Sequence, residues 1–367
     1  MKKFRFIING EGSGDIYALI AVVSEVQIAC AQNGLQAKIM YLGPYGDYIK
    51  ILRANDIKVH HIAFGGLFKR IWGWVQASWW VYWFMPNVIL SNGGEAAGVV
   101  KAAGRFYFVP FMFHEQNAVP ELRDQKIAKR AKKVTLAFEA AAKYFTGELI
   151  YTGTPVRSYI LPKESEREKD QSFAKRILGF EAERPLIFIN GGSAGAPSIN
   201  AFVAENLPYL LQFTQIVHQT GRIHYDSVVG AVSQISHGIP PELLGGYKTV
   251  DYFEKDIQTA YVASDLVMGR SGPGNLAEIA AFGKPALLVP APESENSTQR
   301  YNAVEFAKGG AAAIVEEQNL LPNLVISKLQ ELLGNPEKLQ EMAAAAAAQY
   351  KPNAATDIAG LILTFAR

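Results

Sequence analysis

Short apolar runs alternate with helix-length segments along the whole chain of 367 residues. Four runs end in a glycine turn that opens a helical pattern: FRFIIN before GEGSGD, NVILSN before GGEAAG, PLIFIN before GGSAGAPS, and SDLVMGR before SGPGN. Further apolar runs lie between them, namely AKIMYLG, YFVPFMFH, KVTLAF, TQIVHQTG and PALLVP. Strands that alternate with helices form parallel sheets through right-handed crossovers. The pattern therefore predicts an α/β protein with two strand sets.

The two strand sets are separated by LPKESEREKDQS at 161–172, which is charged and poor in core-forming residues. We expect this segment to link two doubly wound, Rossmann-like domains over 1–160 and 173–367, with the last helix able to pack back on the first domain. Such sheets bind ligands beyond the carboxyl ends of their strands, so we expect the site in a cleft between the domains. The alanine-rich segment 342–350 is predicted to be helical from propensity alone.

The composition, with 49% apolar and 19% charged residues, is typical of a globular protein. One cysteine, Cys30, excludes a disulfide framework and indicates a reducing compartment. The start MKKFRFIING has too short an apolar run for a signal peptide. We therefore expect a cytoplasmic protein.

The net charge of +2 conceals two halves of opposite sign. Residues 1–160 contain 19 Lys and Arg against 11 Asp and Glu, whereas the remainder contains 17 against 23. A basic half favours anionic lipid, nucleic acid or a phosphorylated substrate, and the count alone does not choose among them. The halves are expected to face different partners.

The stretch FKRIWGWVQASWWVYWF at 68–84 contains all five tryptophans of the chain. No charged residue lies between Ile71 and Gly94, but Gly73, Pro86 and the strand NVILSN oppose a membrane span and favour a helix over 67–85. On a helical projection Phe68, Trp72, Val75, Trp79 and Trp83 share one stripe, with Trp80 beside it and Trp74 and Val81 opposite. These rings either fill a core or meet a membrane interface, with Lys69 and Arg70 at the basic end.

Each glycine turn can direct backbone N–H groups at an anion near a helix N-terminus, although glycine is also an ordinary turn residue. Four turns in matching positions favour phosphate binding. GEGSGD lacks the third glycine of the dinucleotide fingerprint, and the expected acidic ribose ligand is absent, so a hydride-transfer enzyme is a weak fit.

Two further features are candidates for chemistry. HEQN at 114–117 follows a buried run where parallel sheets place active sites, or else forms a loop that only hydrogen-bonds itself. Glu278 lies in the first turns of the helix after SGPGN, where a carboxylate can accept two hydrogen bonds from a ribose diol or serve as a capping group.

Several motifs resemble, in order and spacing, those of the MurG glycosyltransferases. They are HEQN, TGTPVR at 152–157, GGSAGA at 191–196, HQTG at 218–221, Phe253 in DYFEKD, and GRSGPGNLAEIAAFGKPALLVP followed by QRYNA. The resemblance extends from Asn9 to about Phe365 and implies a GT-B fold, in which two Rossmann-like domains face a cleft. It implies inverting transfer of N-acetylglucosamine from UDP-N-acetylglucosamine to undecaprenyl-diphospho-muramoyl-pentapeptide, converting lipid I to lipid II in peptidoglycan synthesis.

The resemblance also implies a place for each donor group. Phe253 and the backbone of Glu254 would meet the uracil, Glu278 the ribose and Gln299 the sugar hydroxyls. The diphosphate would be held by Ser193 and the loop amides around Gly192, Ser271 and Gly272, assisted by Arg157. No cofactor and no metal is expected, because loop amides and helix N-termini can stabilise the leaving UDP and the chain has no Asp-x-Asp pair.

The acceptor half departs from the family pattern. GGTGGH has become GEGSGD, so Asp15 stands in place of a candidate catalytic histidine. Asp15 is expected either to act as a base, with a pKa raised by burial, or to cap a helix starting at Ile16. Glu115 and His114 are the alternative bases.

The second loop, GGYxSGP in the family, reads GGEAAGV at 93–99, and this weakens the identity of the acceptor. Ala194 and Thr298 replace two family glutamines, which alters the contacts expected for the donor sugar. The acceptor-side contacts are expected from Gly12, Gly14, Gly94, Glu95 and Asn117.

Three functions stay open on this basis: lipid II synthesis, transfer of a UDP-sugar to another lipid such as a diacylglycerol or a polyprenyl phosphate, and a catalytically silent scaffold that binds a nucleotide-sugar. The membrane-bound acceptor and the basic first half favour a membrane dock at Trp72, Trp79, Trp80, Trp83, Lys69 and Arg70. The expected partners are an anionic membrane surface at the inner face of the cell membrane and cell-wall synthesis proteins, with no nucleic acid.

Overall fold

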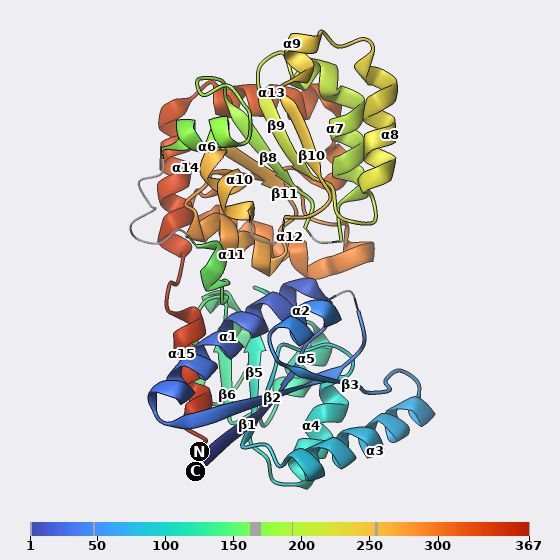
Figure 1. Ribbon diagram of the computed structural model, residues 1–367, viewed down its shortest axis with the longest axis vertical. Coiled ribbons are helices and arrows are strands. Elements are labelled where there is room, and N and C mark those ends of the chain that lie inside the picture. The colour runs from blue at the N-terminus through green and yellow to red at the C-terminus, as the bar shows by residue number, and fades with distance from the viewer. Residues whose placement is uncertain (1, 47, 162–169, 193, 254–255, 367) are drawn as a thin grey trace. The chain divides into compact units, whose positions relative to one another are not determined.

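The computed structural model describes residues 2–46, 48–161, 170–192, 194–253 and 256–366 (Figure 1). The chain forms two compact units, one from Met1–Arg157 with Lys351–Arg367 and the other from Ser158–Tyr350. We call them the first and the second unit.

The first unit is built on a seven-stranded sheet in the order β3-β2-β1-β4-β5-β6-β7, and every adjacent pair is parallel. Its strands are β1 (Lys2–Asn9), β2 (Leu35–Gly43), β3 (Lys58–His61), β4 (Val88–Ser91), β5 (Phe111–Glu115), β6 (Lys133–Leu136) and β7 (Leu149–Tyr151). Its helices are α1 (Gly12–Gln32), α2 (Ile49–Ala54), α3 (Leu67–Phe84), α4 (Ala97–Phe106), α5 (Leu122–Ala128), the 3-10 helix η1 (Glu139–Tyr144) and α15 (Ala354–Leu363).

Two hydrophobic cores cover the two faces of this sheet, because alternate side chains of a strand point to opposite sides. On one face Phe6 and Ile8 of β1 pack against α1 and α15, and on the other Ile7 packs with residues of α3 and α4. Figure 1 shows α1 and α15 together and α3 alongside α4. The central strands are buried on both faces, and for this reason their sequences are continuous apolar runs.

The second unit is built on a six-stranded sheet in the order β10-β9-β8-β11-β12-β13, again parallel throughout. Its strands are β8 (Leu186–Asn190), β9 (Gln215–Gln219), β10 (Tyr247–Val250), β11 (Leu266–Gly269), β12 (Ala286–Leu288) and β13 (Ala312–Ile314). Its helices are α6 (Gln171–Ile177), α7 (Pro197–Leu210), α8 (Tyr225–Ser236), α9 (Pro241–Leu244), α10 (Ile257–Ala263), α11 (Pro273–Ala281), α12 (Glu293–Lys308), α13 (Pro322–Leu333) and α14 (Pro336–Gln349), with 3-10 turns η2 (Ser158–Ile160) and η4 (Glu317–Asn319).

Both sheets have the strand order of a doubly wound fold, which reverses between β1 and β4 and between β8 and β11. The predicted α/β class with two parallel sheets is confirmed. Of the predicted helix over 342–350, all but Tyr350, the C-cap, lies within α14.

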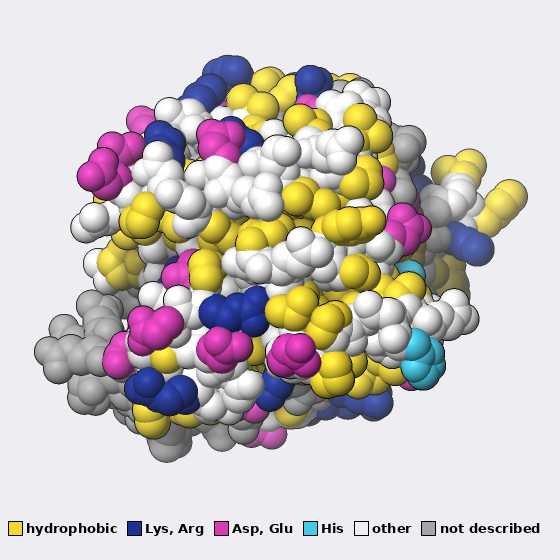
Figure 2. Space-filling model, turned by 90° about the horizontal axis from the view of Figure 1, so that it is seen from above, with side chains coloured by type: hydrophobic (Ala, Val, Ile, Leu, Met, Phe, Trp, Pro, Cys, Tyr) yellow, Lys and Arg dark blue, Asp and Glu magenta, His cyan; other side chains and the backbone are white. Residues whose placement is uncertain are grey.

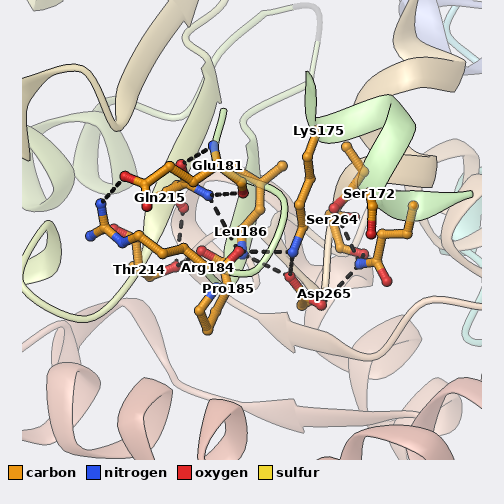
Figure 3. A network of polar contacts seen from close by, with 12 residues as sticks. Ser172, Lys175, Glu181, Arg184, Pro185, Leu186, Thr214, Gln215, Ser264 and Asp265 are labelled. Carbon is orange, nitrogen blue, oxygen red and sulfur yellow. Dashed lines mark hydrogen bonds and ion pairs between the residues drawn. The ribbon is translucent and has the colours of Figure 1, made fainter. Parts of the chain in front are cut away.

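A buried polar network fixes α6 to its own sheet (Figure 3). Lys175 of α6 is 5% exposed, and its Nζ lies 2.8 Å from Oδ2 of Asp265 while donating to the Arg184 carbonyl. Asp265 also accepts from the Leu186 N–H and from the side-chain amide of Gln171. Because an unpaired buried charge is costly, removal of either partner of this ion pair would destabilise the second unit.

One described helix, α1, reaches the length and apolarity of a membrane span, over Gly14–Gln32 with a mean hydropathy of 1.5. Half of that stretch is buried within the protein, which is also typical of a core helix. The uncharged stretch 71–94 is not one helix, since it is divided between α3 and β4.

Candidate functional site

The loops after β1, β4 and β5 gather the acceptor-side residues at the carboxyl edge of the first sheet. Helix α1 begins at Gly12 with Glu11 as its N-cap, so the predicted capping of a helix starting at Ile16 by Asp15 is wrong. Asp15 lies in the first turn instead, because Gly12, with a φ of 80°, lets the chain enter the helix earlier. Its Oδ2 accepts the Glu11 N–H at 3.2 Å, which satisfies a backbone donor at the start of the helix.

HEQN and the first glycine turn meet through a side-chain contact. Nε2 of Gln116 donates to Oδ1 of Asp15 at 2.8 Å, so both oxygens of this half-buried carboxyl group have a donor. Burial raises the pKa of Asp15 well above its ordinary value, and Asp124, Glu115 and Glu11 add to the rise through like charge.

Glu115 and His114 lie deeper in the sheet. Oε1 of Glu115 accepts the backbone N–H and the side-chain amide of Asn117, at 2.8 and 3.1 Å, and burial raises the pKa of Glu115 to about 8. Nδ1 of His114 lies 2.9 Å from Oγ1 of Thr135, and burial lowers the pKa of His114 to about 4. At neutral pH Glu115 is therefore largely protonated and His114 uncharged.

The loop after β4 is held by a second carboxylate. Oε1 of Glu11 accepts the Ala96 N–H at 3.0 Å, which joins the loops after β1 and β4. Gly94 has a φ of 93°, and a Cβ there would meet the Glu11 side chain, so only glycine fits. Asp124 of α5 is buried beside Gly93, and burial raises its pKa to about 6. The sequence reasoning missed Asp124, which lies outside every glycine turn.

Three other predicted site residues lie in the first unit. Gly14 is within α1, and Glu95 lies 3.9 Å from Arg123 in a solvent-exposed ion pair. Arg157 is 3% exposed, and its guanidinium lies 4.0 Å from the centre of the Tyr17 ring. The role of Arg157 toward a diphosphate stays a prediction.

The aromatic helix α3 divides its rings between two sides. Gly73, Ala77 and Val81 are buried against the sheet, and Gly73 leaves no room for a Cβ beside the Ala63 carbonyl. Trp80 is half-buried and stacks on His60 with ring centres 3.5 Å apart, and Trp74 is half-buried against Phe106.

The opposite side of α3 is an exposed stripe of large apolar side chains. It comprises Phe68, Ile71, Trp72, Val75, Trp79 and Trp83, which are between 43% and 86% exposed, with Lys69 and Arg70 exposed at the same end as Phe68. The core interpretation is therefore wrong for these rings. The face seen in Figure 2, by contrast, intersperses hydrophobic, basic and acidic side chains, the mixture typical of a solvated surface.

In the second unit, the loops after β8 and β9 are joined by amide side chains. Oδ1 of Asn190 accepts the Gly192 N–H and the Gln219 side-chain amide, each at 2.9 Å. Oε1 of Gln219 in turn accepts the Phe253 N–H at 2.9 Å, and the Phe253 ring packs edge-on against Phe188. The predicted contacts Ser193 and Glu254 lie outside the described residues.

The carboxylate of Glu278 on α11 is held by a buried tyrosine. The Tyr261 hydroxyl lies 3.1 Å from Oε2 of Glu278 and 3.1 Å from Oδ1 of Asn275, and it accepts from the Asn190 side-chain amide at 3.1 Å. The Asn275 amide donates to the Arg270 carbonyl, which fixes the turn before α11. The sequence reasoning missed Tyr261 and Asn275. The available signal for this site was Tyr261 itself, which is fully buried in a helix, because a buried tyrosine hydroxyl needs a hydrogen-bond partner.

The remaining donor-side residues surround the start of α11. Gly272 is the N-cap of α11, and the Ser271 hydroxyl donates to the Gln299 carbonyl at 2.7 Å. Oε1 of Gln299 accepts the Ala291 N–H at 3.1 Å, and its role toward the sugar hydroxyls stays a prediction. Among the described residues, no group of three His, Cys, Asp or Glu side chains could hold a metal ion.

Comparisons with known proteins give one consistent answer. Residues 186–358 match the model of the glycosyltransferase family 28 C-terminal domain. The UDP-N-acetylglucosamine–N-acetylmuramyl-(pentapeptide) pyrophosphoryl-undecaprenol N-acetylglucosamine transferase of Caldanaerobacter subterraneus subsp. tengcongensis is 30% identical, over 98% of this chain and 99% of the relative. The transferase of the same name from Moorella thermoacetica is 32% identical, over 98% of each chain.

A solved structure agrees. The crystal structure of Acinetobacter baumannii MurG is similar with a TM-score of 0.74 and 25% identity, covering 98% of this chain and 99% of that one. The similarity extends over nearly the whole length of both chains. The chain therefore belongs to the MurG family of glycosyltransferases.

Proposed function

We propose that this protein transfers N-acetylglucosamine from UDP-N-acetylglucosamine to a lipid-linked N-acetylmuramyl-pentapeptide, the reaction named for its relatives. The observation that carries the proposal is the retained donor arrangement in the second unit, where Glu278 is held by Tyr261 beside the N-terminus of α11. A carboxylate that can accept from a ribose diol, next to a helix N-terminus, suits a uridine diphosphate.

The donor would bind along the carboxyl edge of the second sheet. Phe253 and the Glu254 backbone would contact the uracil, and Glu278 the ribose. The loop around Gly192 and Ser193 and the turn at Ser271 and Gly272 would face the diphosphate, with Arg157 as a further cation. As the bond from the anomeric carbon to UDP breaks, negative charge grows on the diphosphate, and fixed N–H groups stabilise it without reorganising.

Asp15 would act as the base. In an inverting transfer the acceptor oxygen attacks the anomeric carbon while its proton passes to a base, and the UDP oxygen leaves from the opposite face. Asp15 is half-buried, its pKa is raised, and the donors Gln116 and Glu11 fix its two oxygens. Glu115 is 2% exposed and is occupied by Asn117, so it would position the loop rather than meet the acceptor.

The exposed stripe of α3 would place the protein at the membrane that carries its acceptor. Tryptophan and tyrosine side chains favour the membrane interface, and cations beside them favour anionic lipid. This supports a peripheral enzyme whose first unit faces the lipid.

A different lipid acceptor is the second candidate, because three carboxyl groups surround the loops where the family is thought to hold the acceptor diphosphate. These are Glu11, Asp15 and Asp124. The deciding experiment incubates the purified protein with labelled UDP-N-acetylglucosamine and, separately, lipid I, a diacylglycerol or a polyprenyl phosphate. Product from lipid I alone supports the first proposal, and product from another lipid alone supports the second.

A further inference from the structure

A cavity of about 810 Å³ opens on the first unit between the start of α3, α4 and α5. Its lining contains seven cationic residues and one carboxylate, Glu95: the cations are Arg70, Lys101, Arg105, Arg123, Lys126, Lys129 and Arg130. Apolar atoms of Val99 and Ile127 also line it. We call this cavity the basic pocket.

Most of these cations have no counter-ion among the described residues. Arg123 pairs with Glu121, Asp124 and Glu95, whereas no ion pair with a described residue is formed by Arg70, Arg105, Lys126, Lys129 or Arg130. Lys101 donates instead to the Ile127 and Lys129 carbonyls at 2.6 Å each, which fixes the end of α5. Burial lowers the pKa of Lys101, and the like charges of Arg105 and Arg130 lower it further. An anion bound here would relieve that repulsion.

The glycine turns of this unit present the opposite charge. Glu11 and Asp15 occupy the loop after β1, and Asp124 lies against Gly93 in the loop after β4. A diphosphate in these turns would meet carboxyl groups at close range, and an anion is repelled by ionised carboxylates beside it. Glycine turns bind phosphate in other proteins, but in this unit they are therefore an unfavourable site for a diphosphate.

The basic pocket adjoins both the turns and the aromatic helix. Arg123 lines the pocket and its neighbour Asp124 lies against Gly93, so α5 contributes to both sites. Arg70 lines the pocket from α3, on the same helix as the exposed Phe68 and Trp72. An amphiphile could place its chain on α3 and its charged group in the pocket, leaving its sugar over the loop after β4.

Building on the proposed function, we propose that the basic pocket, and not the glycine turns, binds the diphosphate of the lipid-linked acceptor. The pocket is large enough for a diphosphate with part of its sugar. Its exposed cations make the binding dependent on ionic strength.

The test uses the double variant Arg105→Gln/Lys126→Gln, whose two side chains are exposed and whose loss leaves the core intact. Its matched control is Lys328→Gln/Lys338→Gln, which removes one half-buried and one exposed cation from α13 and α14. Calorimetry measures inorganic pyrophosphate binding to protein saturated with UDP, so that the donor site is already filled. Wild type and control are expected to bind pyrophosphate, and the pocket variant about tenfold or more weakly, with unchanged UDP affinity.

Kinetics then separate the acceptor from the membrane surface. With a short-chain, water-soluble lipid I analogue and no bilayer, the pocket variant is expected to raise the KM for the acceptor about tenfold while the KM for UDP-N-acetylglucosamine stays unchanged. An unchanged acceptor KM, together with weaker binding to phosphatidylglycerol vesicles, would overturn the proposal in favour of general attraction to anionic lipid. If the wild-type protein does not use lipid I at all, the proposed function fails. The pyrophosphate titration then tests the basic pocket by itself, and absence of pyrophosphate binding by wild type would refute the pocket as a diphosphate site.

Discussion

The side-chain amide of Gln116 donates a hydrogen bond of 2.8 Å to Oδ1 of Asp15, a residue 101 positions earlier in the chain. The contact joins the end of β5 to the first turn of α1. Gln116 is 2% exposed, so its own orientation is fixed by packing. The hydrogen bond therefore connects the HEQN motif to Asp15, the carboxylate that stands in place of the histidine of the family pattern.

Replacing Asp15 by Asn is expected to lower kcat by a factor of roughly 100 or more, since an amide cannot take the acceptor proton. The KM for UDP-N-acetylglucosamine should stay unchanged, because Phe253 and Glu278, the proposed uracil and ribose contacts, lie in the second unit. Burial raises the pKa of Asp15, so the wild-type kcat should rise with pH through that raised pKa, and the variant should lack this rise. Initial rates across pH measure both effects. A variant within tenfold of wild type, with the same pH profile, would remove Asp15 from the chemistry.

Replacing Glu115 by Gln is expected to change the pH dependence of stability. Burial raises the pKa of Glu115 from 4.5 to about 8, so the folded state keeps a proton that the unfolded chain releases in that window. This contribution to stability is complete below pH 4.5 and is lost as pH rises toward 8. The difference in unfolding free energy, wild type minus variant, should therefore fall from pH 5 to pH 8.

Urea unfolding followed by tryptophan fluorescence measures this difference in the first unit, because all five tryptophans lie in α3. A difference that stays constant from pH 5 to pH 8 would contradict the raised pKa.

Replacing Tyr261 by Phe is expected to raise the KM for UDP-N-acetylglucosamine about tenfold or more with kcat nearly unchanged. The hydroxyl holds Oε2 of Glu278 at 3.1 Å, and a hydrogen bond to a charged group contributes about 1.5 kcal/mol or more. Tyr247→Phe is the matched control, since its hydroxyl lies 3.0 Å from Nδ1 of His218 instead. Equal effects of the two variants would indicate a general loss of stability and not positioning of Glu278.

Replacing Trp79 and Trp83 together by Ala is expected to weaken binding to anionic vesicles roughly tenfold, through lost apolar contact with lipid. Both rings are about 60% exposed, and their ring contacts are edge-on, with each other at 5.7 Å and between Trp83 and the exposed Tyr82 at 5.5 Å, so the fold should persist. Tyr209→Ala, an exposed aromatic of α7, is the control, and UDP affinity should be the same in all three proteins. Vesicle binding equal to that of wild type would dismiss α3 as a membrane contact.

Local patterns predicted much of this molecule. The apolar runs before glycine turns correspond to β1, β4, β8 and β11, and the tryptophan-rich stretch forms α3 with its predicted stripe exposed. These features depend on strand and helix periodicity over fewer than twenty residues. Trp80, expected beside the stripe, is half-buried because it stacks on His60 of β3.

Features that join distant segments escaped prediction. The basic pocket collects cations from α3, α4 and α5, and the sequence shows it only as an excess charge in residues 1–160. The bonds of Gln116 to Asp15 and of Tyr261 to Glu278 depend on which strand ends are neighbours in the sheet. The capping prediction for Asp15 failed because glycine at position 12 starts α1 one turn earlier.

The central claim is the transfer itself, and one measurement tests it most directly. Purified protein is incubated with UDP carrying labelled N-acetylglucosamine and with lipid I in detergent, and label in the extracted lipid is counted for wild type and Asp15→Asn. The account predicts stoichiometric release of UDP with label appearing in lipid II for wild type, and at most about one hundredth of that rate for the variant. No label in the lipid with wild-type protein that binds UDP would contradict it.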